Sequence, residues 1–275
     1  MNETLIKTFT KDRTKGNPAY VVKVDGSVTQ EEIQAATASH DTLTVFMYEN
    51  ESTPRVRFFP SQKESPFCGH GLIAVAHDLP VNTEVTLTLA MLNKEVVVRK
   101  NEDGLIHFNA GCLSMDRPYE KLEMVAHLLN IPVSAIDPTH PLTIASIGSP
   151  KLLVPVKCLT DLHEMSPHFC KISAWSHDNQ VNGIYVYTEE TLDKAANFHA
   201  RSFNPLYGVE EDIATGVAAG ALSGVLYKRY EQKSVVIEQG YVLGSGSTIN
   251  SFVDERSHVY VGGYAVRIGK SFSLM

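Results

Sequence analysis

The chain has 275 residues, of which 43% are hydrophobic and 20% charged, and its formal net charge is −7 at pH 7. This length suits two domains better than one compact core, and the composition is that of a folded globular protein. Lysine and arginine form no cluster or stripe, so we expect no nucleic-acid partner.

Membrane and metal signals are both missing from the sequence. No run approaches the roughly 18 apolar residues that a membrane-spanning helix needs, and the first residues lack a basic segment followed by an apolar one. We therefore expect a cytoplasmic protein with no membrane partner. The four cysteines show neither CxxC spacing nor histidines at zinc-finger spacing. We expect no metal site and no disulfide framework.

Short runs of β-branched and aromatic residues between turn signals predict a strand-rich protein. The predicted strands cover residues 5–9, 19–24, 43–48, 55–59, 84–89, 95–99, 105–109, 151–156, 183–187, 198–203, 235–238, 248–253 and 258–268. Four helices are predicted, over residues 33–39, 69–79, 122–129 and 214–230. The first follows a capping-box pattern that begins at Thr29, and the third ends before Pro132.

The helices at 69–79 and 214–230 are apolar nearly all round, which predicts that both are buried. Together with the strands they predict an α+β protein of two lobes, each a curved sheet around a central helix. We place the lobes at residues 1–118 and 119–275, since a proline-rich segment follows the helix at 122–129. The C-terminal strand can return to complete the first lobe.

A strand, a turn and an apolar helix that starts with glycine occur twice, about 144 residues apart, at 57–77 and 201–220. The first residues of a helix carry unpaired N–H groups and partial positive charge, so they bind carboxylates and developing oxyanions. Two such helix starts facing each other would hold a small acid, with His70 and Asp212 to move protons. The alternative is that the small residues serve only close packing of helix on strand.

Short motifs occur in a fixed order along most of the chain. They are Thr8-Phe-Thr, Gly16-Asn-Pro-Ala19, Arg57-Phe-Phe, Glu64-Ser-Pro-Phe-Cys68-Gly-His70, Val181-Asn-Gly-Ile-Tyr185, Arg201-Ser-Phe-Asn-Pro205 and Glu211-Asp212-Ile-Ala-Thr215-Gly216. Together they resemble the PhzF-like family of phenazine biosynthesis. The resemblance implies a diaminopimelate-epimerase-like fold of two pseudo-symmetric lobes with the active site between them. It also implies a cofactor-independent isomerase that moves a proton on a small carboxylic acid, and a homodimer.

The resemblance also implies roles for individual residues. The family's acid/base histidine falls on His70 and its aspartate falls on Asp212. The positions that the resemblance places at the substrate are Asn17, Gly69, Gly71, Thr215 and Gly216.

The family's catalytic glutamate has no direct counterpart in this chain. Family members usually read Ser-Glu-Thr-x-Phe-Val at the third strand, where this chain reads Asp41-Thr-Leu43-Thr-Val-Phe46. An alignment without a gap places Leu43 at the glutamate position and leaves no acid. One inserted residue instead lets Asp41 serve as a shorter carboxylate. The strand's alternation favours the first alignment, because a one-residue slip turns every side chain over.

Two further differences bear on the substrate. Val217 stands where some relatives have a serine that contacts substrate, and Gly244-Ser245 stands where relatives commonly have an arginine. These differences argue against the phenazine-pathway substrate itself.

Two functions from different classes follow from the sequence. The first is a cofactor-free isomerase or epimerase that uses His70 and Asp212, with Asp41 or a group of the substrate in place of the glutamate. In that role His70 would act as a neutral imidazole, because a helix start opposes its protonation. The second is a non-catalytic protein that binds a small acid and has lost the acid/base residue. The discriminating feature is whether a carboxylate reaches the site beside His70.

Overall fold

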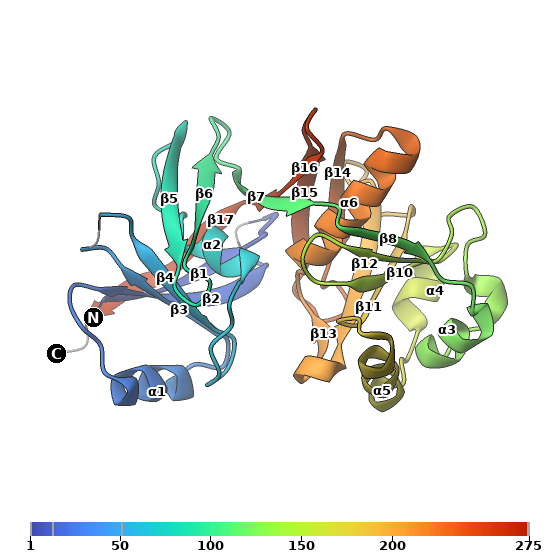
Figure 1. Cartoon of the computed structure of the whole chain (residues 1–275), viewed down its shortest axis with the longest axis horizontal. Coiled ribbons are helices and arrows are strands. Elements are labelled where there is room, and N and C mark those ends of the chain that lie inside the picture. The colour runs from blue at the N-terminus through green and yellow to red at the C-terminus, as the bar shows by residue number, and fades with distance from the viewer. Residues whose placement is uncertain (1, 13, 51, 274–275) are drawn as a thin grey trace. The chain divides into compact units, whose positions relative to one another are not determined.

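The computed structural model describes residues 2–12, 14–50 and 52–273 (Figure 1). Its contacts form two compact units, Met1–Asn109 with Gly262–Met275, and Ala110–Val261. Strand β17 (Ala265–Ser273) pairs with β1 (Asn2–Thr8) inside the first unit. The predicted limits at 1–118 and 119–275 stay a prediction. In the structure, residues 110–118 group with the second unit, where β8 (Met115–Pro118) pairs with β9 (Thr143–Ser146).

The first unit has a sheet in the order β17-β1-β2-β3-β4-β5-β6-β7. Besides β1 and β17, its elements are β2 (Asn17–Val24), α1 (Gln30–Ser39), β3 (Leu43–Tyr48), β4 (Arg55–Phe59), α2 (Gly69–Val75), β5 (Thr83–Leu89), β6 (Lys94–Lys100) and β7 (Ile106–Cys112), whose end reaches the second unit.

In the second unit the sheet order is β8-β9-β10-β11-β12-β14-β15, and β13 also pairs with β12. Besides β8 and β9, its elements are α3 (Leu122–Leu129), the 3₁₀ turn η1 (Val133–Ala135), β10 (Lys151–Pro155), α4 (Leu159–Glu164), α5 (Phe169–Asn179), β11 (Ile184–Thr188), β12 (Phe198–Asn204), the 3₁₀ turn η2 (Pro205–Tyr207), β13 (Val209–Asp212), α6 (Gly216–Tyr230), β14 (Ser234–Gln239), β15 (Ser247–Val253) and β16 (His258–Gly263), whose last two residues belong to the first unit.

The two units repeat one topology. In the first, β1 and β2 are antiparallel, β3 runs parallel to β2, β4 is antiparallel to β3, and β5 after α2 runs parallel to β4. In the second, β9 and β10 are antiparallel, β11 runs parallel to β10, β12 is antiparallel to β11, and β14 after α6 runs parallel to β12. Parallel neighbours need a crossover, and α2 and α6 supply it at corresponding places. The predicted α+β class with two pseudo-symmetric halves is confirmed.

Helices pack on both faces of the first unit's sheet. On one face Phe46 and Phe59 pack with Ile33 of α1. On the other face α2 lies against the strands, and Figure 1 shows it surrounded by them, with α1 outside. The predicted capping box of α1 is confirmed, because the Thr29 hydroxyl and the Glu32 carboxylate each accept the other residue's N–H.

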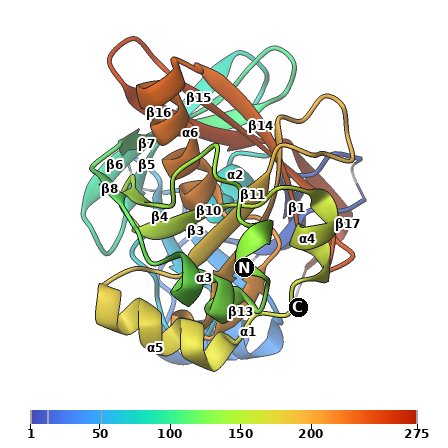
Figure 2. The same cartoon turned by 90° about the vertical axis from the view of Figure 1, so that its right-hand side faces the viewer.

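The second unit has the same layering. Leu152, Ile184 and Phe203 point to one face of its sheet and pack in a core with α3, α4 and α5. Figure 2 shows α3 and α5 side by side in this outer layer, where Lys171 and His127 also make a hydrogen bond. The buried helix α6 contacts β9, β10, β14 and β15. As predicted from its sequence, α6 is apolar on all sides and buried over most of its length.

Several elements differ from the prediction. Helices α4 and α5 and strands β8, β9 and β13 were not predicted, since each is short or carries mixed polarity. The helix predicted at 69–79 ends at Val75, and the strand predicted at 258–268 is two strands separated by Tyr264. Among the residues described, no helix has both the length and the hydropathy of a membrane-spanning segment.

Candidate functional site

An arginine–glutamate ion pair fixes the segment before each repeated helix. Arg57 of β4 donates to both carboxylate oxygens of Glu64, at 3.0 and 2.6 Å. At the corresponding position of β12, Arg201 donates to both oxygens of Glu211, at 2.9 and 2.7 Å. Bidentate pairs of this kind fix geometry as well as charge. The repeat seen in the sequence is therefore a repeat of structure.

Each arginine of the pair also lies over an aromatic ring two residues further along its strand. Arg57 lies 5.1 Å from the ring centroid of Phe59, and Arg201 lies 5.0 Å from that of Phe203. Arg201 is the more deeply held, because it also donates to the backbone oxygens of Leu162 and Met165. The helix starts are thus positioned by matched contacts in the two units.

His70 is the second residue of α2 and is partly buried. Its Nε2 lies 2.7 Å from the carbonyl oxygen of Pro18, which can only accept a hydrogen bond. The proton of a neutral imidazole therefore sits on Nε2, and Nδ1 keeps its electron pair. The same carbonyl oxygen accepts the hydroxyl of Thr42 at 2.8 Å.

Burial lowers the pKa of His70 to about 4, although the hydrogen bond to Pro18 opposes the shift. His70 is then neutral at pH 7 and is able to accept a proton. This protonation state agrees with the prediction from the sequence. The catalytic role itself remains a prediction.

The predicted substrate residues of the first unit lie around His70. Asn17 begins β2, is buried, and precedes the Pro18 that binds the imidazole. Gly69 and Gly71 flank His70 in α2, and both are required by packing. A Cβ on Gly69 would lie 2.7 Å from the Phe108 ring, and one on Gly71 would lie 2.6 Å from the Phe58 ring. Close packing therefore explains the glycine at both positions without any contact to a substrate.

Asp41 and Leu43, the two candidates for the position of the family's glutamate, differ in burial. Leu43 is the first residue of β3 and is 4% exposed. It shares a face of β3 with Val45, which a Cβ on Gly71 would approach to 3.1 Å, so Leu43 points to the α2 side. Asp41 precedes the strand and is exposed. The choice between the two alignments stays a prediction.

Asp212 ends β13 and belongs to a hydrogen-bond network in the second unit. Its Oδ2 accepts the Thr215 hydroxyl at 2.7 Å, and its backbone oxygen accepts from Gln239 at 2.8 Å. Gln239 is fully buried and also contacts Thr215 through both of its amide atoms. The structure thus brings together two predicted site residues, Asp212 and Thr215, at the start of α6.

Asp212 does not cap the helix that follows. The helix begins at Gly216, and its N-cap is Thr215. The predicted start at Ala214 is therefore two residues early. Asp212 instead accepts the hydroxyl of Thr215 and, at 3.5 Å, the backbone N–H of Ala214.

A second group of polar residues lies close to Asp212 and was not predicted. Lys151 begins β10, is 3% exposed, and donates from Nζ to the backbone oxygen of Asn182 and to Oδ1 of Asn204. Tyr185 of β11 is 0% exposed, and its hydroxyl has no hydrogen-bond partner among the described residues. We call Lys151, Tyr185, Asn204 and Asp212 the Lys151 cluster.

The register of the strands places the Lys151 cluster on one face of the sheet. Tyr185 pairs with Ser202, and Ser202 pairs with Asp212, so the three side chains form a cross-strand row. Leu152, Ile184 and Phe203 point to the opposite face, toward α3, α4 and α5. Their strand neighbours, which include Lys151 and Asn204, therefore point away from those helices.

The charges within the Lys151 cluster influence one another. Burial lowers the pKa of Lys151 to about 7, and the Asp212 carboxylate partly offsets this shift. Burial and the same carboxylate raise the pKa of Tyr185 well above its ordinary value, so its phenol stays protonated. The cluster therefore offers a proton donor and an amine able to titrate near neutral pH.

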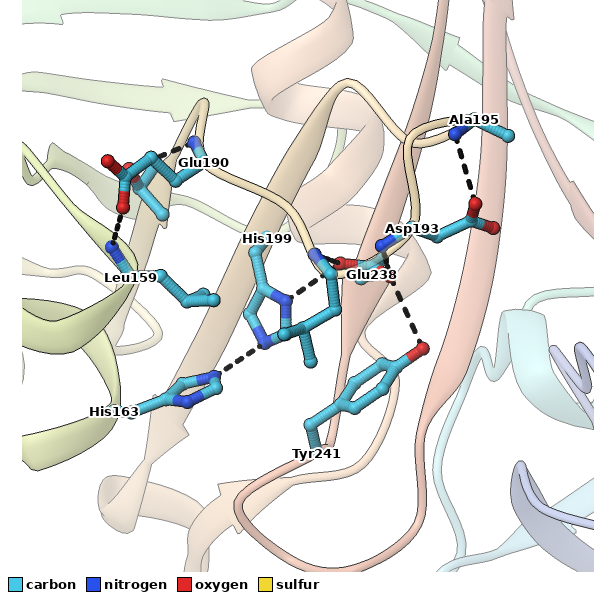
Figure 3. Close-up of polar contacts among 10 residues, drawn as sticks. Leu159, His163, Glu190, Asp193, Ala195, His199, Glu238 and Tyr241 are labelled. Carbon is cyan, nitrogen blue, oxygen red and sulfur yellow. Dashed lines mark hydrogen bonds and ion pairs between the residues drawn. The ribbon is translucent and has the colours of Figure 1, made fainter.

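Another buried network of the second unit is shown in Figure 3. The Glu238 carboxylate accepts from His199 at 2.9 Å, from the backbone N–H groups of Leu192 and Asp193 at 2.8 Å each, and from Tyr241 at 3.3 Å. Nε2 of His199 in turn lies 3.1 Å from Nε2 of His163.

Glu238 is held as a fully paired carboxylate. Burial raises its pKa, but the hydrogen bonds from His199, Leu192 and Asp193 leave the pKa below its ordinary value. Four donors use the acceptor capacity of its two oxygens. The network attaches the loop that precedes β12 to Glu238 of β14. Its described donors are hydrogen-bonded, unlike the hydroxyl of Tyr185.

The sequence offered little sign of the Lys151 cluster. A lysine at the first position of a strand is usually an exposed end residue, and the run after it, Leu-Leu-Val-Pro-Val, predicts only a buried strand. The cluster depends on pairing between β10, β11, β12 and β13, and β13 was not predicted. Only the register of these strands brings Lys151 near Asp212.

Comparisons with known proteins agree with this architecture. The model of the family described as phenazine biosynthesis-like protein matches residues 6–270. An uncharacterized isomerase of Clostridium acetobutylicum is 28% identical, with 97% of this chain and 95% of that protein covered. The trans-2,3-dihydro-3-hydroxyanthranilate isomerase of Pseudomonas chlororaphis is 26% identical, with 97% and 96% covered. A crystal structure of a Bacillus anthracis phenazine biosynthesis protein of the PhzF family superposes with a TM-score of 0.86 at 25% identity, covering 100% and 99% of the two chains.

Proposed function

Because the chain belongs to the phenazine biosynthesis-like family, we propose that it is an isomerase or epimerase that moves a proton on a small carboxylic acid without a cofactor. His70 and Asp212 handle the proton. The isomerases named among its relatives support the reaction class.

The observation that carries this proposal is the tautomer of His70. Its Nε2 proton is committed to the Pro18 carbonyl, and burial keeps the ring neutral at pH 7. The electron pair on Nδ1 is then available to accept a proton from the carbon next to a carboxyl group. Positioned acid/base groups of this type contribute about 10² to 10⁴ in rate.

Asp212 complements His70 as a second proton-handling group. Its Oδ2 accepts the Thr215 hydroxyl, which fixes the carboxylate at the start of α6. The first residues of this helix, Gly216 and Val217, carry N–H groups that favour an anion. A carboxylate substrate held there would present its neighbouring C–H to the acid/base groups.

Exchange of C–H with solvent deuterium tests this proposal without knowledge of the substrate. The enzyme is incubated in D₂O with α-amino acids of both configurations, 2-hydroxy acids and trans-2,3-dihydro-3-hydroxyanthranilate, and loss of each C–H signal is followed by NMR. At least one acid should exchange. His70→Gln and Asp212→Asn should each slow that exchange at least tenfold, whereas His177→Gln, at an exposed position, should not.

The binding-protein alternative makes a different prediction for the same panel. It is favoured by the burial of Leu43 on the α2 side, at the position that the ungapped alignment gives to the glutamate. The melting temperature of a non-catalytic protein would rise in the presence of one of the acids, because the acid binds the folded state preferentially. Such a protein would exchange no C–H. Exchange that both His70→Gln and Asp212→Asn leave unchanged would rule out the proposed roles.

A further inference from the structure

The hydrogen bonds of Lys151 match the number of donors that a neutral amine has. An uncharged amine has two N–H donors and one electron pair, whereas an ammonium has three donors and no acceptor. Lys151 donates to two acceptors, the backbone oxygen of Asn182 and the side-chain oxygen of Asn204. Both acceptors are uncharged. No carboxylate among the described residues makes a hydrogen bond or ion pair with Nζ. In the neutral form of Lys151 both N–H donors are then used and the electron pair is left open.

Tyr185 supplies a second open group on the same face of the sheet. Its side chain is completely buried, and its hydroxyl has no partner in the part of the chain that is described. A buried hydroxyl without a hydrogen bond costs roughly 1–3 kcal/mol, so such a group calls for an explanation. A ligand that accepts its proton would remove this cost. The cross-strand row from Tyr185 to Asp212 places that ligand beside the carboxylate.

We propose that Lys151 is a catalytic base of the isomerase, and that Tyr185 donates a hydrogen bond to the oxygen that becomes negative in the reaction. This inference rests on the proposed function. The amine takes the proton from the carbon next to the carboxyl group and becomes an ammonium. The electron pair of the broken C–H bond enters the enolate, whose oxygen accepts from Tyr185. The ammonium of Lys151 then returns its proton to carbon to give the product, which restores the neutral amine.

This assignment would explain how the chain works without the family's glutamate. The base would be Lys151 of β10. A neutral amine with a pKa near the working pH is an efficient base, because it combines the right protonation state with a driving force for transfer. Burial provides that pKa of about 7 for Lys151.

The titration of Lys151 depends on few charged neighbours. Asp212 on β13 is the carboxylate that acts on it, and Tyr185 on β11 remains a neutral phenol. The paired segment of β9 offers Ala145 and uncharged neighbours. In α6 the cationic residues, Lys228 and Arg229, lie in the last turn and are ion-paired with Asp116.

The protonation state of Lys151 can be measured without a substrate. In protein labelled with ¹³C at lysine Cε, the Lys151 signal is the one missing from Lys151→Met. It should titrate with a midpoint near 7. A midpoint above about 9 for Lys151 would mean a charged ammonium at neutral pH and would overturn the assignment.

Exchange of C–H with deuterium then tests the role of both residues. Lys151→Met should slow exchange at least a hundredfold, and Lys151→Arg should not restore it, because a guanidinium stays protonated. Tyr185→Phe removes a hydroxyl that has no partner, so it should leave the melting temperature unchanged or higher and yet slow exchange at least tenfold. Lys194→Met should retain wild-type exchange.

The outcomes separate this inference from the proposed function. If the wild-type protein exchanges a C–H and Lys151→Met, folded by circular dichroism, exchanges it equally fast, Lys151 is not the base and the isomerase proposal stands. If Tyr185→Phe loses stability in step with activity, the hydroxyl has a structural role and the donor assignment fails. If the wild-type protein exchanges nothing in the panel, both proposals fail together.

Discussion

The Nε2–H of His70 donates a hydrogen bond to the carbonyl oxygen of Pro18, 2.7 Å away and 52 residues earlier in the sequence. This single bond connects α2 to β2 and decides which ring nitrogen is open. It also links stability to pH, because a ring that must remain neutral in the folded state resists protonation.

The pH dependence of stability should therefore change in His70→Gln. The pKa of His70 is about 4 in the folded state against 6.5 for the free side chain, so between these values the unfolded state binds more protons. The wild-type free energy of unfolding should fall as pH drops from about 6.5 toward 4. Glutamine keeps a donor for Pro18 but does not titrate, so the variant should lose about 3 kcal/mol less over that window.

Urea unfolding at several pH values between 7 and 4 measures this difference. His177→Gln is the matched control, since His177 is 79% exposed, and its pH profile should follow the wild type. Parallel profiles for wild type and His70→Gln would contradict the burial argument. Other partly buried histidines act equally in both proteins and cancel in the comparison.

The two arginine–glutamate pairs should differ in their effect on stability because they differ in burial. The side chains of Arg201 and Glu211 are 6% and 8% exposed, and those of Arg57 and Glu64 are 24% and 20% exposed. Glu211→Gln leaves a buried guanidinium without its carboxylate and should cost about 3 kcal/mol. Glu64→Gln leaves a better solvated arginine and should cost about 1 kcal/mol. Equal losses in urea unfolding would contradict this ranking.

Gly71 should be intolerant of any side chain, whatever its role toward substrate. A Cβ there would lie 2.6 Å from Cδ1 of Phe58 and 3.1 Å from Cγ2 of Val45, and both residues are buried. Overpacking of this kind costs about 1–3 kcal/mol, so Gly71→Ala should lower the melting temperature by several degrees. Gly26→Ala meets no atom within 4 Å and should change it little. A fully stable Gly71→Ala would leave substrate contact as the explanation for this glycine.

Local patterns were sufficient to predict the halves of the fold. The strands at 43–48 and 55–59 coincide with β3 and β4, and the capping box at Thr29 begins α1 as expected. Apolar composition on all sides predicted that α6 is buried, and nine consecutive residues of it, from Ala218 to Leu226, are buried. These features depend on periodicity and on short-range hydrogen bonds, which a sequence contains.

The candidate site was only partly predictable, because its chemistry depends on contacts between distant segments. His70 and Asp212 stood out through motif and repeat. The tautomer of His70 depends on Pro18, 52 residues away, and the burial of Lys151 depends on Asn182 and Asn204. No local pattern marks a lysine whose partners are supplied by a loop and by the end of another strand.

Lys151→Met should have a higher free energy of unfolding than the wild type near pH 7, and this difference should shrink as the pH rises. The pKa of Lys151 is about 7 in the folded state and 10.5 in its ordinary range, so between these values the unfolded state binds more protons and the wild type gains stability with rising pH. Methionine fills a similar volume and does not titrate. Its stability advantage over lysine should be largest near pH 7 and should shrink by about 3 kcal/mol between pH 7 and about pH 9.5.

Urea unfolding of wild type, Lys151→Met and Lys194→Met at both pH values decides the point. Lys194 is exposed, so Lys194→Met should differ from the wild type by the same small amount at each pH. A pH-independent difference for Lys151→Met would show that Lys151 keeps an ordinary pKa in the folded protein. In that case its two carbonyl partners hold an ammonium, and the open electron pair does not exist.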